Sequence, residues 1–122
     1  MRINGRHVDL FPASAQVLGA LCETPGIPVH HMDIEEVVGP GTNLEQQVSY
    51  LRRTFRELVD AGTLSSDTIR ERVREHASGK TVEGLDDMDI RSLMRRFVAS
   101  QRGFGYLICL SPADVVIDAG DE

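Results

Sequence analysis

The sequence contains few of the residue types that would by themselves indicate a structural or functional class of protein. It contains no tryptophan, a single lysine and only two cysteines, Cys22 and Cys109, in 122 residues. Both cysteines lie in apolar segments and show no CxxC spacing. A free cysteine behaves as a small core residue, so we expect two reduced, buried thiols rather than a disulfide framework.

Long apolar runs are also missing. No stretch approaches the ~18 residues that a membrane-spanning helix needs, and the opening "MRINGRHVDL" lacks the apolar core of a signal peptide. Apolar residues make up 41% of the chain and charged residues 26%, as in ordinary globular domains. We therefore expect a single-domain cytoplasmic protein without a membrane segment.

Recognisable catalytic and metal-binding patterns are absent from the sequence. There is no phosphate-binding GxxxxGK and no local Ser/His/Asp or Cys/His signature. His30 and His31 are adjacent, and neighbouring helical side chains point apart. Asp86, Asp87 and Asp89 are typical of a helix start, where carboxylates favour the helix dipole. We expect no enzyme, no cofactor and no metal site.

The distribution of charge is more informative than its sum. The net charge of −6 argues against a nucleic-acid partner. However, four of the 19 acidic residues lie in the last nine positions, and eleven of the 13 basic residues fall between Arg52 and Arg102. Twelve of the 13 are arginines, which grip phosphate and guanine with two parallel hydrogen bonds. A locally basic face on an acidic protein is therefore possible.

Periodicity and turn residues predict an α+β fold. The expected elements are an N-terminal hairpin around Asn4-Gly5, helices over residues 12–22, 30–38, 44–61 and 85–97, a marginal helix over 65–79, a strand-turn-strand over 98–110, and an acidic tail over 112–122 with a short strand near 115–117.

The helix over residues 44–61 has the strongest pattern. Its apolar positions repeat at helical spacing along one stripe, which consists of Leu44, Val48, Leu51, Phe55, Leu58 and Val59. The opposite face carries Gln46, Ser49, Tyr50, Arg53 and Arg56. Such a helix buries one side and presents a polar, arginine-bearing side.

The segment "SQRGFGYLICL" predicts a tight, charged hairpin tip. Arg102 precedes Gly103 and Gly105, which bracket Phe104. Glycines permit a sharp turn and keep bulk away from a partner. Tyr106 is expected to pack back on the core.

These elements together are typical of a winged helix-turn-helix, in which the third helix enters the DNA major groove and the hairpin is the wing. The chain also resembles the effector domains of OmpR-type response regulators, in "VDLFPASAQVLGAL", "TPGIPV", "LEQQVSYLRRTF" and "QRGFGYLI". By this resemblance residues 1–111 form the domain, residues 62–97 are an insertion, and a chain of 122 residues is a stand-alone regulator without a receiver domain.

The resemblance implies that double-stranded DNA is bound by Gln46, Ser49, Tyr50 and Arg53 in the major groove and by Arg102 from the wing. The residue chemistry agrees. Arg53 can grip guanine and Gln46 can pair with adenine, while Ser49 and Arg56 can reach phosphates. Because one winged helix reads few base pairs, we expect a homodimer or a protein partner.

Three alternatives remain open at this stage. "DIRSLMRRF" also fits the family's third-helix pattern, which would place Arg91, Arg95 and Arg96 on the DNA. Glu57 and Asp60 could pair with Arg53 and Arg56 and leave only a solvated face. The acidic balance favours a winged-helix module that binds protein instead, such as another regulator or RNA polymerase, or that acts as an acidic antagonist.

Overall fold

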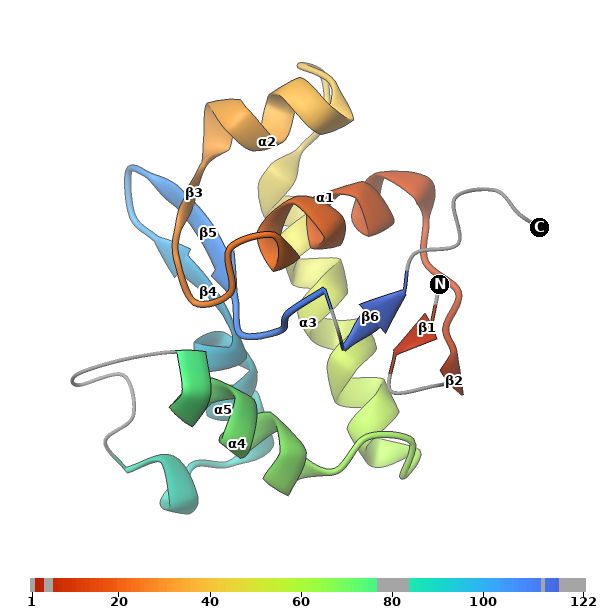
Figure 1. The fold of residues 1–122 in the computed structure, drawn as a ribbon, viewed down its shortest axis with the longest axis vertical. Helices are drawn as coiled ribbons and strands as arrows, with labels where there is room; N and C mark the ends of the chain where they lie inside the picture. The colour runs from red at the N-terminus through yellow and green to blue at the C-terminus, as the bar shows by residue number, and fades with distance from the viewer. Residues whose placement is uncertain (1, 4–5, 77–83, 113, 117–122) are drawn as a thin grey trace.

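The computed structural model describes residues 2–3, 6–76, 84–112 and 114–116, which form an α+β fold (Figure 1). The elements within the described residues are β1 (Arg2–Ile3), β2 (Arg6–His7), α1 (Pro12–Cys22), β3 (Val29–His30), α2 (His31–Val38), α3 (Leu44–Asp60), α4 (Ser66–His76), the 3₁₀ helix η2 (Leu85–Asp87), α5 (Ile90–Phe97), β4 (Val98–Gln101), β5 (Gly105–Ile108) and β6 (Val115–Val116). None of the described helices is both long and apolar enough to cross a membrane.

The predicted C-terminal hairpin is confirmed, and it belongs to a three-stranded antiparallel sheet of order β3-β5-β4. β4 pairs with β5 from Val98 opposite Ile108 to Gln101 opposite Gly105. On its other edge, β5 pairs with β3, and Val29 lies opposite Tyr106. The strand β3 was not expected, because its two residues follow a segment rich in proline and glycine that predicts a turn.

A complete N-terminal hairpin is not seen. β1 and β2 pair as two-residue strands, and the expected turn at residues 4–5 lies outside the described residues. The second strand ends at His7, so the expected alternation does not continue through Val8 and Leu10. Val8 instead joins the core. The free edge of β1 pairs with β6, which draws part of the predicted tail into a second small sheet.

The third helix is confirmed. α3 spans 17 residues and runs through the centre of the molecule (Figure 1). Asn43 caps it, because its side-chain oxygen accepts a hydrogen bond of 3.1 Å from the backbone N–H of Gln46. The predicted stripe is buried at Leu44, Val48, Leu51 and Phe55, and Leu58 and Val59 pack against the core.

The described residues between α3 and β4 pack against the rest of the fold. α4 buries Ile69 and Val73 completely, and it packs on α5. The expectation of one helix over 85–97 is wrong, because the chain is extended at Met88 (ψ 138°) between η2 and α5. Asp89 starts α5 afresh by accepting a 2.9 Å hydrogen bond from the N–H of Ser92, a backbone group that has no partner inside the helix.

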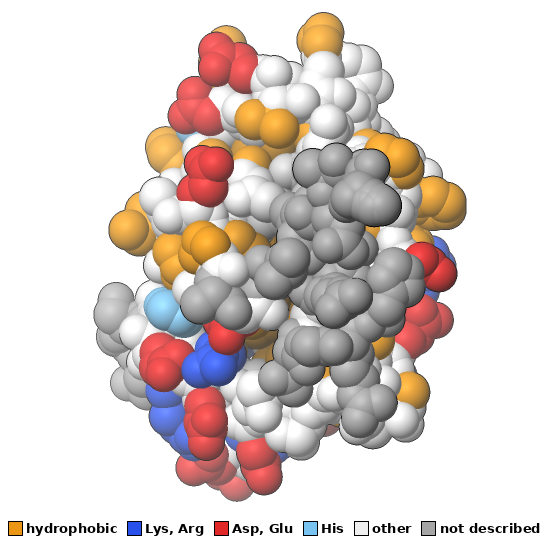
Figure 2. Space-filling view, turned by 45° about the vertical axis from the view of Figure 1, so that its right-hand side comes forward, with side chains coloured by type: hydrophobic (Ala, Val, Ile, Leu, Met, Phe, Trp, Pro, Cys, Tyr) orange, Lys and Arg blue, Asp and Glu red, His pale blue; other side chains and the backbone are white. Residues whose placement is uncertain are grey.

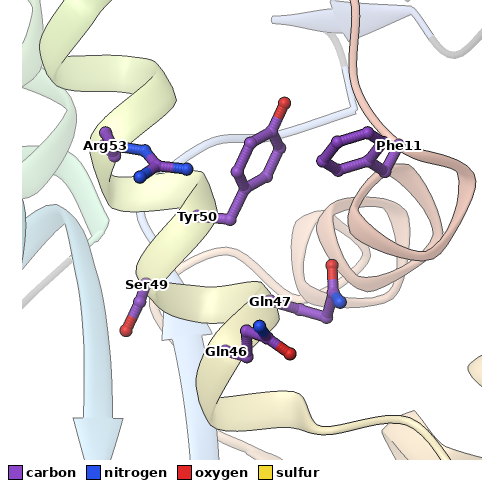
Figure 3. A pocket seen from close by; sticks show the side chains of 6 residues that line it. All are labelled: Phe11, Gln46, Gln47, Ser49, Tyr50 and Arg53. Carbon is purple, nitrogen blue, oxygen red and sulfur yellow. The ribbon is translucent and has the colours of Figure 1, made fainter.

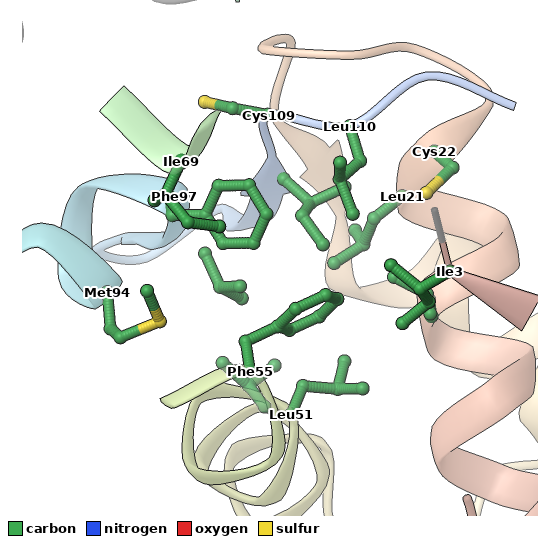
Figure 4. Close-up of a cluster of buried hydrophobic side chains, with 14 of the residues drawn as sticks. Ile3, Leu21, Cys22, Leu51, Phe55, Ile69, Met94, Phe97, Cys109 and Leu110 are labelled. Carbon is green, nitrogen blue, oxygen red and sulfur yellow. The ribbon is translucent and has the colours of Figure 1, made fainter. Parts of the chain in front are cut away.

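One hydrophobic cluster joins α3, α5 and the main sheet (Figure 4). At its centre the rings of Phe55 and Phe97 meet edge to face, with centroids 5.0 Å apart and planes at 80°. This pair fixes the approach of α5 to α3. The two cysteines are buried and free, as the sequence predicts.

Burial of the thiols gives the free energy of unfolding a pH dependence. Desolvation, with a smaller contribution from the charge of Asp114, raises the pKa of Cys22 from 9.0 to about 12, and desolvation raises that of Cys109 to about 11. Above about pH 9 the unfolded chain ionises these thiols while the folded chain keeps them protonated. We therefore expect unfolding to become easier by about 1.4 kcal/mol per pH unit per thiol between about pH 9 and 11.

Urea unfolding measured at steps from about pH 8 to pH 10.5 tests this expectation. The double variant C22A/C109A is the control, because it lacks both thiols and should lose this part of the slope. Equal slopes in the two proteins would contradict the proposed linkage.

Candidate nucleic-acid interface

The predicted DNA-facing side of α3 is open to solvent. Gln46, Ser49, Arg53 and Arg56 are exposed, and Tyr50 is half-buried. A pocket of about 540 Å³ lies against this face and is lined by Phe11, Gln46, Gln47, Ser49, Tyr50 and Arg53 (Figure 3). Four of the predicted site residues therefore lie together on one concave surface.

An aromatic and cationic stack runs across this face. The Phe11 and Tyr50 rings have centroids 5.0 Å apart at an interplanar angle of 32°. The guanidinium carbon of Arg53 lies 5.5 Å from the centroid of the Tyr50 ring. Figure 3 shows the Tyr50 ring between the other two side chains. A cation over an aromatic face is attracted by the ring quadrupole, so Arg53 is oriented by its neighbours on the free protein.

Sequence reasoning missed Phe11, which is 64% exposed although it is large and apolar. It is the residue immediately before Pro12, the first residue of α1, and its side chain makes no capping hydrogen bond. The available signal in the sequence was a large apolar residue directly ahead of a helix. The contact of Phe11 with Tyr50 depends on how α1 packs on α3. That packing is fixed in part by Ser14, whose buried hydroxyl donates a hydrogen bond to the side chain of Gln47.

The two alternative sets of arginines converge on one groove. A pocket of about 250 Å³ lies between α3 and α5, and it is lined by Arg52, Arg53, Arg56, Arg91, Met94 and Arg95. Arg96 is exposed but does not line this pocket. We call this pocket the arginine groove. Arg53 lines both it and the pocket beside Phe11, so the two hollows adjoin along α3.

Arg52 has a different role from its neighbour Arg53. Its Nε donates a 2.7 Å hydrogen bond to the carbonyl of Val98, and its Nη2 donates one of 3.0 Å to Oγ of Ser100. Burial, and secondarily the positive charge of Arg95, lower the pKa of its guanidinium. Arg52 thus ties α3 to β4. The sequence alone could not distinguish it, because both arginines follow Leu51.

The arginines on α3 and α5 have no carboxylate partner within ion-pair distance among the described residues, whereas those on α4 do. Arg70 pairs with Asp67, and Arg72 pairs with Glu75 and Asp114. Arg74 pairs with Asp86. The expected alternative, in which Glu57 and Asp60 neutralise Arg53 and Arg56, is not found in this part of the chain.

The hairpin tip places Arg102 in solvent. The turn closes with a 3.0 Å hydrogen bond from the N–H of Phe104 to the carbonyl of Gln101. Gly103 has φ +76°, a conformation that side chains disfavour. Arg102 lines a separate pocket of about 230 Å³ together with His31, Ser100, Gln101, Gly103, Phe104, Gly105 and Tyr106. Tyr106 packs against the core as predicted.

Gly105 is needed for a reason other than the turn. It is the first residue of β5, and a Cβ there would lie 1.8 Å from the carbonyl oxygen of Val29 in β3. Of the two glycines expected in the turn, only Gly103 lies in it. Gly105 instead allows β3 and β5 to approach.

The hairpin tip is also joined to the start of α2. The N–H of His31 donates a 2.9 Å hydrogen bond to the carbonyl of Phe104, and the rings of His30 and Phe104 meet edge to face at 5.0 Å. The expectation that His30 and His31 point apart is wrong, because their rings stack at 4.3 Å. His30 lies in β3 and caps α2. The rule that adjacent side chains within a helix point apart therefore does not apply to this pair.

Acidic side chains lie on several parts of the surface, and Glu45 lines a hollow together with the predicted site residues Gln46 and Ser49. Figure 2 shows acidic side chains at the top of the molecule, where α2 lies, whereas acidic and basic side chains mix at the bottom, where α4 lies. No group of three or more metal-ligating side chains that could hold an ion is found in the described part of the chain.

Comparisons of the chain with protein-family models, with curated proteins and with solved structures give no match.

Proposed function

We propose that this protein is a sequence-specific double-stranded DNA-binding transcriptional regulator with a winged helix-turn-helix fold. In this proposal α2 and α3 form the helix-turn-helix, α3 enters the major groove, and the β4–β5 hairpin is the wing. The observation that carries the proposal is the exposed face of α3, where Gln46, Ser49, Tyr50 and Arg53 line one concave surface.

The order of the elements supports this proposal. α2 leads into α3 through a short connection, and the sheet β3-β5-β4 places the hairpin beside them. A helix of 17 residues is about 25 Å long, and the major groove is about 12 Å wide and admits one helix. In known helix-turn-helix proteins the second helix of the motif reads bases.

The structure favours α3 over α5 as the recognition helix. α5 has eight residues and buries Leu93, Met94 and Phe97. α4 packs against α5 as well, which restricts the entry of α5 into a groove. The exposed face of α3 adjoins the pocket beside Phe11 and the arginine groove.

Two substitutions should separate base reading from phosphate binding. We expect R53A to relax sequence preference, at a cost of about 1–3 kcal/mol of discrimination at the guanine that Arg53 would contact. We expect R102A to weaken binding to all duplexes nearly equally and to lower the slope of log affinity against log salt by about 1. Selection from a random duplex library at moderate salt, followed by titration of the selected and scrambled duplexes, measures both.

The control for these variants is R74A, which removes one positive charge from α4 on an arginine that is already paired with Asp86. It should change neither the selected sequence nor, by more than a small amount, the salt slope. The site assignment is overturned if R53A and R102A both bind like the unsubstituted protein.

A second candidate function is a winged-helix module that docks on a protein such as another regulator or RNA polymerase. It is favoured by the exposed apolar side chains near the acidic α2, namely Ile27 at 60%, Met32 at 60% and Val37 at 52% exposure. Its test is co-sedimentation with purified RNA polymerase. Binding there, combined with no binding to random duplexes at low salt, would favour this function over the first.

A further inference from the structure

We infer that the arginine groove between α3 and α5 is a binding site for the phosphodiester backbone of duplex DNA. The inference rests on the proposed function and extends it. It gives the inserted segment a role, because α5 supplies half of a phosphate-binding surface beside the base-reading face of α3.

The groove has a fixed geometry. The edge-to-face contact of Phe55 and Phe97 holds the two helices together beneath it, and the buried side chain of Met94 lines it. Arg91 and Arg95 lie four residues apart, so they share one face of α5. Arg52 and Arg56 have the same spacing on α3. The guanidinium groups therefore come from two facing helix surfaces.

The electrostatics of the groove favour an anion. Five arginines line a volume of about 250 Å³, and none of the carboxylates in the described residues lies within ion-pair distance of them. The carboxylate of Asp89 interacts with Arg91 and Arg56, and it also caps α5 through its hydrogen bond from the N–H of Ser92. Five guanidinium groups with one such carboxylate nearby still repel one another, and a bound polyanion removes that repulsion.

The position of the groove selects the backbone of DNA as this polyanion. Arg53 lines both the groove and the pocket on the exposed face of α3. When a helix lies in the major groove, the sugar-phosphate strands pass along its two sides. The side of α3 that faces α5 is therefore the side along which one strand would run. Guanidinium forks match phosphate oxygens in a two-pronged arrangement.

The test compares two charge-matched double variants. R91A/R95A removes two arginines that line the groove, and R72A/R74A removes two arginines of α4 that do not line it and that pair with Asp114 and Asp86. The probe is a labelled duplex of about 30 base pairs of random sequence, titrated at several salt concentrations. We expect R91A/R95A to lower the salt slope by about 2 and to weaken binding roughly 10- to 100-fold at about 0.1 M salt. The control should bind nearly as the unsubstituted protein does.

Three outcomes are distinguishable. If the unsubstituted protein binds no duplex, the proposed function fails, and the inference fails with it. If it binds and R53A impairs sequence preference, but R91A/R95A behaves like its control, the inference alone is overturned. A changed sequence preference in R91A/R95A would also overturn it, because α5 would then read bases. Thermal unfolding verifies that each variant is folded, and R91Q/R95Q replaces the alanine variant if its midpoint falls.

Discussion

G105A is expected to destabilise the fold by more than about 3 kcal/mol, at the upper end of what overpacking costs. The added Cβ would lie 1.8 Å from the carbonyl oxygen of Val29 and 3.0 Å from the N–H nitrogen of His31. Both are backbone atoms, which cannot rotate away as a flexible side chain does. β5 is the middle strand and is also held by β4, so relief requires breaking β3 from the sheet.

The matched control for this variant is G103A, two residues earlier. Gly103 has φ +76°, but a Cβ there would meet nothing within 4 Å, so the expected cost is only the left-handed strain of about 1–2 kcal/mol. Urea unfolding gives both values, and hydrogen exchange at the amide of His31 reports separation of the hairpin from α2. Equal costs for the two variants would refute the close-approach argument.

F55A is expected to lower the free energy of unfolding by about 3–5 kcal/mol, the usual cost of removing a buried phenylalanine. Phe55 is fully buried, and it contacts Phe97 across the junction of α3 and α5 (Figure 4). Its removal leaves a cavity where α5 meets α3. Total stabilities of domains are about 5–15 kcal/mol, so this one substitution removes a large share.

Two further variants serve as comparisons for F55A, and each is expected to lower the free energy of unfolding by less. F55L keeps most of the volume and loses the ring contact, so its cost should be smaller. F104A removes a phenylalanine that is 41% exposed, so it should cost well under the value for F55A, in line with other surface positions. Chemical unfolding measures all three. A cost for F55A no larger than for F104A would show that the cluster does not join α3 to α5.

Helices were predictable where the chain repeats apolar residues over several turns. α1 and α3 form where they were expected, and α3 buries its expected stripe, because the spacing of apolar residues determines which face of a helix is buried. α4 has only Ile69 and Val73 as anchors, and its stability comes from packing on α5. The break at Met88 was missed because apolar periodicity continues across it, whereas the cap at Asp89 is a local hydrogen bond.

Short strands were less predictable because their partners lie far away in the sequence. β3 has two residues and is defined only by its pairing with β5, about 75 positions later. β6 pairs with β1 across nearly the whole chain. Two residues carry no alternation that could distinguish a strand from a loop. The sequence indicated a short strand near residues 115–117, where β6 lies, but neither its pairing with β1 nor the strand β3 could be predicted without the tertiary arrangement.

The candidate site was predictable residue by residue but not as a surface. Helical spacing places Gln46, Ser49, Tyr50 and Arg53 on one face of α3, and the structure shows them lining one pocket. The sequence presents the arginines of α3 and α5 as rival sites. They lie beside one groove because of the angle at which α3 and α5 pack. The residue pattern within a single helix does not predict that angle.

The two hydrogen bonds from Arg52 to β4 bear on the entropy of binding. They fix the base of the hairpin relative to α3 in the free protein, and the bond from His31 to Phe104 holds the hairpin tip against α2. Under the proposed function, helix and wing would meet a duplex with their separation already set. The hairpin then loses its conformational freedom when the protein folds rather than when it binds DNA. A duplex whose grooves do not match the fixed separation of helix and wing would bind less well.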